Sequence, residues 1–371
     1  MRARDTRTTD LDAVSTHKTA FSHDLRILAC ANCGGPIEGT PTGGSVTCSF
    51  CNTPNQVAAR DESRDRAAAT TAPTMSEAQR FERLRAQDGK PLMPPPNLAH
   101  LLQGGGLPPQ NVQAAQGEWQ RARFELTQAP GNFASAERLH FLTMMIYGAL
   151  SKMQGQERQV RAMLETALDV LTEPRHRQEI HGMLARNAAR VGDANAAEQW
   201  LALCNPYSDD LQADTAYRHS RAYVSTVKGD YQTVIQVLGA RIDDVPINDS
   251  ADEACGVLRA NAYERLGQMQ FAVEQLVQLM TGHPAGPQLI ERIIAANAIL
   301  GLCTNSYPQA RQQLGQMAAT AVKTKGGFNF GCLFFPLFFG GFAIPAVIFG
   351  SQAIIDPAYQ GVVTAVVVGG Y

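Results

Sequence analysis

Two Cys-x-x-Cys pairs near the N-terminus are the residues whose types and spacing most directly predict chemistry. The pairs are CANC at 30–33 and CSFC at 48–51, with fourteen residues between them. Two pairs at this spacing can place four thiolates tetrahedrally around one Zn²⁺ ion. The sequence therefore predicts a zinc site whose ligands are Cys30, Cys33, Cys48 and Cys51.

The segment around these cysteines must aim four sulfurs at one point. Residues 24–58 read as short strands and tight turns, and Gly34 and Gly35 follow the first pair. This segment resembles the zinc-ribbon family, and the resemblance implies that the four cysteines are zinc ligands. Four thiolates leave no open coordination position, so we expect a structural rather than a catalytic metal. Metal binding would supply the fold, because the segment has few large apolar side chains: Leu28, Ile37, Val46, Phe50 and Val57.

The ribbon carries almost no charge. Glu38 is the only charged residue between Arg26 and Arg60, and the whole chain has a formal net charge of -2. Phosphate contacts require Lys or Arg, so we expect the ribbon to be structural or to contact protein. Two alternatives stay open: contact with nucleic acid or transcription machinery, and a redox dithiol pair.

A repeat of 37 or 38 residues runs through the middle of the chain. Its anchor positions are Gly117, Gly155, Gly192, Gly229, Gly267 and Asn305. A small or β-branched residue stands five positions after each anchor: Ala122, Val160, Ala197, Val234, Ala272 and Ala310. A leucine stands nine positions after each anchor: Leu126, Leu164, Leu201, Leu238, Leu276 and Leu314. The pattern predicts helical hairpins in which the anchor residue accepts a left-handed turn.

Three stretches carry a more specific resemblance: VGDANAAEQWL at 191–201, KGDYQTVIQVL at 228–238 and LGQMQFAVEQL at 266–276. They resemble tetratricopeptide repeats, although the period is longer than that family's ~34 residues. The resemblance implies a mainly α fold, a helical-hairpin solenoid over 111–321, with a concave groove that binds a protein or peptide partner. It makes six residues candidates to line that groove: Arg186, Arg190, His219, Tyr223, Asn261 and Arg265.

Residues 326–355 contain no charged side chain. This uncharged stretch is longer than the ~20 apolar residues needed to cross a bilayer. We expect a C-terminal membrane helix here, with Lys323 and Lys325 holding the N-terminal body on the cytoplasmic side. An apolar extension docked on the repeats is the alternative. The apolar tail at 356–371 could form a second membrane segment or a β-branched extension.

The remaining segments indicate modularity. Residues 1–23 are predicted to be disordered and 59–110 to be a flexible linker, and no secretory signal is apparent. No activated nucleophile, open metal position or cofactor motif appears, so we do not expect an enzyme. The sequence thus predicts a membrane-anchored, cytoplasm-facing adaptor. A membrane-complex component that oligomerises through its Gly-rich tail around 340–341 is a further alternative.

Overall fold

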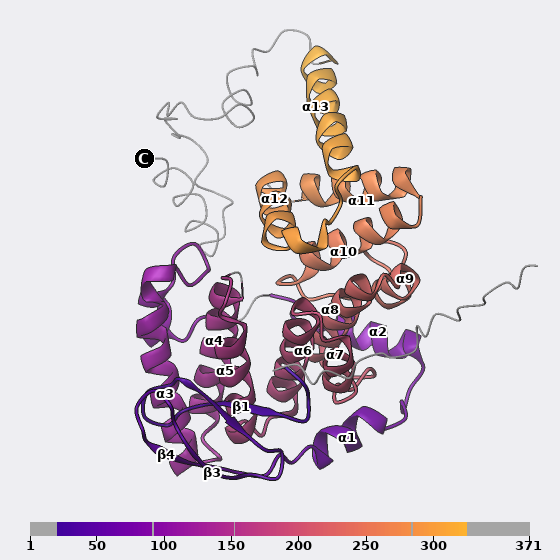
Figure 1. Cartoon of the computed structure of the whole chain (residues 1–371). Helices are drawn as coiled ribbons and strands as arrows, with labels where there is room; N and C mark the ends of the chain where they lie inside the picture. The colour runs from indigo at the N-terminus through magenta and orange to yellow at the C-terminus, as the bar shows by residue number, and fades with distance from the viewer. Residues whose placement is uncertain (1–20, 91–92, 152, 283–284, 325–371) are drawn as a thin grey trace, which may run out of the picture.

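A computed structural model describes residues 21–90, 93–151, 153–282 and 285–324 (Figure 1). The protein is mainly α-helical with a small N-terminal β region, as predicted. The helices are α1 (Ser63–Thr70), α2 (Glu77–Arg85), α3 (Val112–Gln128), α4 (Phe133–Leu150), α5 (Glu157–Val170), α6 (Pro174–Arg190), α7 (Ala194–Leu201), α8 (Leu211–Lys228), α9 (Tyr231–Leu238), α10 (Asp252–Arg265), α11 (Met269–Gly282), α12 (Gly286–Ala296) and α13 (Ser306–Thr324).

The β region consists of two antiparallel hairpins, one for each Cys-x-x-Cys pair. Strands β1 (Arg26–Ala29) and β2 (Pro36–Gly39) flank the first pair, and β3 (Gly44–Thr47) and β4 (Pro54–Val57) flank the second. Its core is correspondingly small and consists of Leu28, Cys30, Ile37, Cys48 and Val57. A core of this size cannot stabilise a fold alone, so the cysteines must contribute.

Successive helical hairpins follow from α4 onward, and glycines form their turns. Gly155, Gly192, Gly229 and Gly267 separate the two helices of four hairpins and have φ angles of +79°, +84°, +75° and +77°. A residue with a side chain would be strained in this left-handed conformation, which explains glycine at these anchor positions.

The small residues predicted to let helices approach one another are completely buried. Ala122, Val160, Ala197, Val234, Ala272 and Ala310 are all 0% exposed. Each hairpin also packs against the next: α6 contacts α8, α8 contacts α10, and α10 contacts α12. One continuous apolar core therefore runs through the helical region from α3 to α13.

The structure differs from the predicted pattern at the ends of the repeat. Gly117 lies inside α3 rather than at a turn, and Asn305 directly precedes α13. Helix α3 continues through Gly117 because its buried stripe is uninterrupted on either side: Ala115, Trp119, Ala122 and Leu126 are all buried. The first predicted repeat unit is therefore one long helix that packs on α4.

The segment predicted as a flexible linker, 59–110, contains two helices and buried anchors. Helices α1 and α2 lie along the side of the helical region (Figure 1), and Leu84, Leu98 and Leu101 are buried. Two short 3₁₀ helices, Pro96–Leu101 and Pro109–Asn111, follow before α3. The Pro-rich composition predicts a free chain, but Asp65 and Arg80 pair with residues of α6 and α8, and Leu98 and Leu101 join the main apolar core.

The segments predicted to be disordered or membrane-embedded lie outside the described residues, apart from 21–23. This applies to the predicted membrane helix at 326–355 and to the tail at 356–371. Among the described helices, none combines the length and apolar character that crossing a bilayer requires.

Candidate metal centre and the contacts that hold it

The two Cys-x-x-Cys turns have the same backbone geometry. In the first, the Cys30 amide donates to the Gly35 carbonyl at 2.8 Å, and the Gly34 amide donates to the Cys30 carbonyl at 3.0 Å. In the second, the Cys48 amide donates to the Thr53 carbonyl and the Asn52 amide donates to the Cys48 carbonyl, both at 2.9 Å. The residue after each pair has positive φ: +73° at Gly34 and +56° at Asn52. Asn is the side chain that best tolerates this conformation, so the second turn needs no glycine.

These turns bring the four thiols together. All four Sγ atoms lie within 4.8 Å of one another. Cys30 and Cys51 are separated by 3.7 Å between sulfurs, and Cys33 and Cys48 by 3.6 Å. Both distances are far longer than the ~2.05 Å of a disulfide. The four predicted ligands therefore form a candidate metal site.

The acidities of these thiols also favour a cation. Hydrogen bonding with Thr53 lowers the pKa of Cys51 to about 6. The Gly35 amide acts to lower the pKa of Cys33, but burial and the neighbouring sulfurs outweigh it and raise that pKa to about 12. Four thiolates within 4.8 Å of one another repel, and a bound divalent cation would provide the compensating positive charge. Asn55 supports the cluster by donating its Nδ2 to Cys30 Sγ at 3.5 Å.

The module is docked through the outer edge of β1. The Ala29 amide donates to Thr166 Oγ1 at 2.7 Å, and the Ile27 amide donates to Glu165 Oε1 at 3.4 Å. Both acceptors belong to α5, so side chains of that helix satisfy an edge that would otherwise be open. Ala29 also joins the main apolar core. The metal site is therefore held against the helices rather than carried on a free tether.

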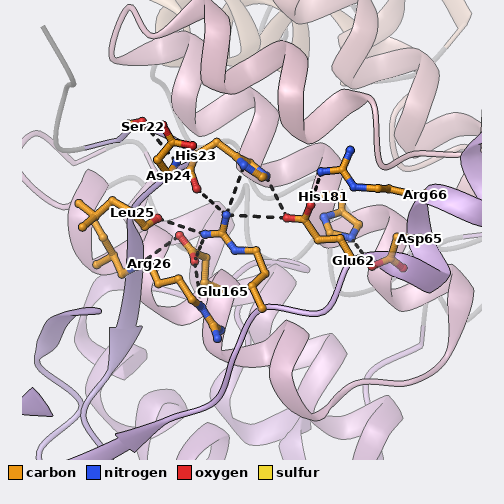
Figure 2. Close-up of polar contacts among 12 residues, drawn as sticks. Ser22, His23, Asp24, Leu25, Arg26, Glu62, Asp65, Arg66, Glu165 and His181 are labelled. Carbon is orange, nitrogen blue, oxygen red and sulfur yellow. Dashed lines mark hydrogen bonds and ion pairs between the residues drawn. The ribbon is translucent and has the colours of Figure 1, made fainter. Parts of the chain in front are cut away.

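A buried ion-pair network lies at this junction (Figure 2). Glu165 is 2% exposed and accepts from Arg161 Nε at 2.6 Å and Arg60 Nη2 at 2.9 Å. Arg26 lies 3.8 Å from the same carboxylate and pairs with Asp169 at 2.5 Å. Arg60 and Arg161 also donate to the Leu25 carbonyl, at 3.1 and 2.5 Å. The network therefore joins both ends of the β module to α5.

Helix α1 continues these contacts on α6. Asp65 is buried and accepts from Arg177 Nε at 2.9 Å and Nη2 at 2.5 Å, and its Oδ2 lies 3.1 Å from His181 Nε2. Burial acts to raise the pKa of Asp65, but the bonds from Arg177 and His181 lower it overall. Arg177 also donates to the carbonyls of Leu168, in the last turn of α5, and of Leu171, in the α5–α6 connection. Asp65 thus fixes α1 where two hairpins meet.

Helix α2 and the residues after it repeat this arrangement farther along. Arg80 pairs with buried Asp214 of α8 at 2.5 Å and donates to the Ser208 carbonyl at 3.1 Å. The Gln87 side chain accepts from the Leu211 amide at 2.8 Å, and the Asp249 amide donates to the Gly89 carbonyl at 3.0 Å. Residues 60–90 thus cross three connections between hairpins in succession, at 171–173, 202–210 and 239–251. We call this segment the strap.

Trp200 provides the aromatic part of the junction. The ring is 1% exposed, and the guanidinium of Arg60 lies 5.0 Å from its centroid. His23 approaches edge-on at 4.5 Å, and His181 stacks at 5.7 Å. An aromatic face beside a guanidinium stabilises the cation. The N-terminal segment, the strap and α7 therefore share one anchor.

The predicted groove residues divide into two groups. Arg186 lies 2.6 Å from His219 Nδ1 and 5.6 Å from the ring centroid of Tyr147, and Tyr223 lies one helical turn after His219. Arg190 is 3.9 Å from Glu157. Asn261, in contrast, is 1% exposed and accepts from the Cys303 amide at 3.1 Å. Arg265 donates to the Gly301 carbonyl at 2.8 Å. Asn261 and Arg265 therefore serve contacts within the chain.

Sequence reasoning missed the junction itself. In the sequence, Arg26 and Arg60 stand out only as the ends of an uncharged stretch. Nothing in the sequence distinguishes Glu165 from an exposed helix residue. The one local signal is the pair Arg161 and Glu165, which is four residues apart, and such pairs are common on exposed helix faces. Their burial depends on the distant β1 strand.

Comparison with known protein families, with curated proteins and with solved structures gives no match for this chain. The case for function therefore depends on the geometry described above.

Proposed function

We propose that this protein is an adaptor that binds protein partners through one rigid surface made of a zinc ribbon and tetratricopeptide-like repeats. The observation that carries the proposal is the docking of the cysteine module on α5 through Glu165, which joins the two parts instead of leaving them on a loose linker. A docked metal module adds surface to the repeats without adding a reactive centre.

Zinc is the ion that best suits the four cysteines. A tetrahedral site with Zn–S bonds of about 2.3 Å has sulfurs about 3.8 Å apart, close to the 3.6 and 3.7 Å found between cysteine pairs. The ion would complete a closed four-thiolate shell, so its role is to hold the fold. Metal analysis of the purified protein should give one zinc per chain. A chain that is folded and free of metal would contradict this assignment.

The helical region supports the tetratricopeptide-like assignment through its turns and its small buried residues. Left-handed glycines recur at Gly155, Gly192, Gly229 and Gly267, and the matching small residues are completely buried. In such an arrangement, the first helices of successive hairpins line one face. Arg186 and His219 lie on these helices, so the face around them is the candidate groove for a partner. Tyr223, on the same helix as His219, is 7% exposed and packs in the apolar core.

The chemistry of this groove favours an acidic peptide. Among the described residues, Arg186 has no carboxylate within ion-pair distance, and its close polar neighbour is His219. Burial and the charge of Arg186 hold the pKa of His219 well below its usual range, so the histidine is neutral and does not neutralise a ligand carboxylate. An acidic peptide would supply the counter-charge to Arg186. Arg186→Ala should weaken partner capture, whereas Arg121→Ala, which removes an exposed arginine paired with Glu118, should not.

We also propose that residues 326–355 anchor the adaptor in a membrane, with the described body on the cytoplasmic side. This rests on the uncharged sequence and on the two lysines before it. Carbonate extraction should leave the intact chain in the membrane fraction and release a chain that ends at Lys325. Extraction of both would contradict the anchor. Proximity labelling with the same two chains would separate membrane-dependent partners from those bound by the repeats alone.

The charged side chains of the ribbon are already paired within the protein, which disfavours binding to a nucleic acid. Glu38, the only charged side chain between Arg26 and Arg60, pairs with Arg158 of α5. Arg26 and Arg60 are themselves engaged with carboxylates in the junction. With no free cation on the ribbon, a phosphate backbone would find no counter-charge there. We therefore favour a protein partner over the nucleic-acid alternative.

A further inference from the structure

A cleft of about 280 Å³ separates the first cysteine turn from α3, and it is distinct from the candidate groove around Arg186. None of the described residues that line it carries a charged side chain. Its walls carry five side-chain amides and its floor is apolar. The lining residues are Ala29, Asn32, Cys33, Gly34, Gln113, Gln116, Gly117, Trp119, Gln120, Ile146, Leu150, Gln159 and Met163.

The α3 wall is a stripe with regular helical spacing. Gln113, Gln116, Gly117 and Gln120 stand at i, i+3, i+4 and i+7, so they share one face of the helix. The side-chain amides of these three glutamines and of Gln159 in α5 make no hydrogen bond to any other residue that the structure describes. A side-chain amide both donates and accepts, so the cleft offers four such groups with unused capacity.

Gly117 leaves open space in the middle of this stripe. A glycine inside a helix costs about 1 kcal/mol relative to alanine. No packing need explains it, because a Cβ added there would meet no atom within 4 Å. The glycine keeps open space in the middle of the stripe, where another backbone could approach closely.

The opposite wall and the floor complete the site. The Cys33 thiol is exposed in the cleft wall, and as a metal-bound thiolate it would accept a hydrogen bond from a peptide N–H. Below it lie the apolar side chains of Ile146, Leu150 and Met163, of which Leu150 and Met163 reach the surface, at 5% and 6% exposure. At one end of the cleft, the Gln120 side chain lies beside the first cysteine turn. Its Nε2 would be 3.1 Å from a Cβ atom added at Gly34.

From the amide stripe, the open glycine and the uncharged walls, we propose that this cleft binds an extended, uncharged peptide segment of a partner protein. Main-chain amides of the peptide would pair with the glutamines, and alternate side chains would contact the floor. A charged residue would lose its hydration without gaining a counter-charge from any described side chain of the lining, so the site selects against it. The inference deepens the proposed adaptor function and depends on it, because it assigns a peptide class to a second surface.

The test uses the full-length, zinc-loaded protein in detergent and a phage-displayed library of random dodecapeptides. We expect enrichment of uncharged peptides with alternating apolar residues. Gly117→Leu should fill the cleft and weaken a selected peptide at least about tenfold by calorimetry. The matched control is Gly315→Leu, because Gly315 is also a helical glycine with no atom within 4 Å of an added Cβ. Gln116→Glu, a second variant that changes no backbone preference, should weaken the peptide as well.

Three outcomes would overturn the inference. The first is enrichment of acidic or basic peptides, or of none. The second is equal binding of a selected peptide by the native protein, Gly117→Leu and Gln116→Glu. The third is loss of that peptide on Arg186→Ala while Gly117→Leu still binds it. That last result would place the peptide in the candidate groove and leave the adaptor function standing.

Discussion

Asp65 of α1 and Arg177 of α6 are 112 residues apart in sequence, yet they form a two-pronged ion pair of 2.9 and 2.5 Å. Arg177 simultaneously donates to the Leu168 and Leu171 carbonyls. One carboxylate therefore organises the arginine that joins α5 to α6. Buried arginine requires such a partner, because its charge cannot be neutralised by losing a proton.

Asp65→Asn should release the first part of the strap. It removes the charge that faces Arg177 and His181 while keeping the size of the side chain. We expect limited trypsin digestion to cut faster at Arg64 and Arg66. Asp61→Asn is the control, because exposed Asp61 accepts hydrogen bonds from Ser63 and from no other residue that the structure describes. Equal digestion of the two variants would show that the ion pair does not hold α1.

Glu165→Gln should be strongly destabilising. The change leaves Arg26, Arg60 and Arg161 without a shared buried carboxylate, and the loss of one partner from a buried ion pair costs about 3–5 kcal/mol. Glu198→Gln provides the comparison. Glu198 also pairs with two cations, Arg221 and Lys228, but its side chain is 34% exposed. That change should cost about 0–1 kcal/mol. Chemical unfolding of both variants measures the difference, and equal costs would contradict the importance of burial here.

Stability should fall in acid because of His176. Burial, with His140 and Arg175 nearby, lowers the pKa of His176 from 6.5 to about 3. The unfolded chain therefore takes up this proton below about pH 6.5, while the folded chain excludes it until about pH 3. The free energy of unfolding should fall through this window by up to about 1.4 kcal/mol per pH unit. His176→Gln should make the decline shallower in unfolding measured at several pH values. Parallel declines in both proteins would assign the acid sensitivity to other groups.

Metal removal should loosen the helical region unevenly. Without the ion, the small β core should unfold, and the contacts of β1 with Glu165 and Thr166 would be lost. Hydrogen exchange after chelation should therefore rise in α5 and α6 while α10 and α11 keep their protection. Cys48→Ser should reproduce this pattern. Uniform loss of protection would mean that the protein unfolds as one unit, and unchanged exchange in α5 would mean that the docking is not coupled to the metal.

The sequence predicts features that repeat locally or that have fixed spacing. The turn glycines from Gly155 to Gly267 and the four cysteines are of this kind, because short-range backbone geometry selects them. It does not predict the strap. Asp65, Arg80 and Glu165 have the appearance of solvated helix residues, and their partners lie far away in the chain without any periodic relation. Gly117 shows the opposite error, since its position in a repeat suggested a turn that the uninterrupted buried stripe of α3 does not allow.

The path of the strap has a consequence for synthesis. Residues 60–90 leave the ribosome early, but their partners at Asp214 and Asp249 are translated more than a hundred residues later. The hairpins can form one after another as they emerge, whereas the N-terminal part must wait until α8 and the α9–α10 connection exist. Closing such long loops is slow, so this step should come last. During that interval Arg80 and the carboxylate of Asp214 are both in water, which leaves the N-terminal part of the nascent chain open to proteases and chaperone capture until α8 and the α9–α10 connection have formed.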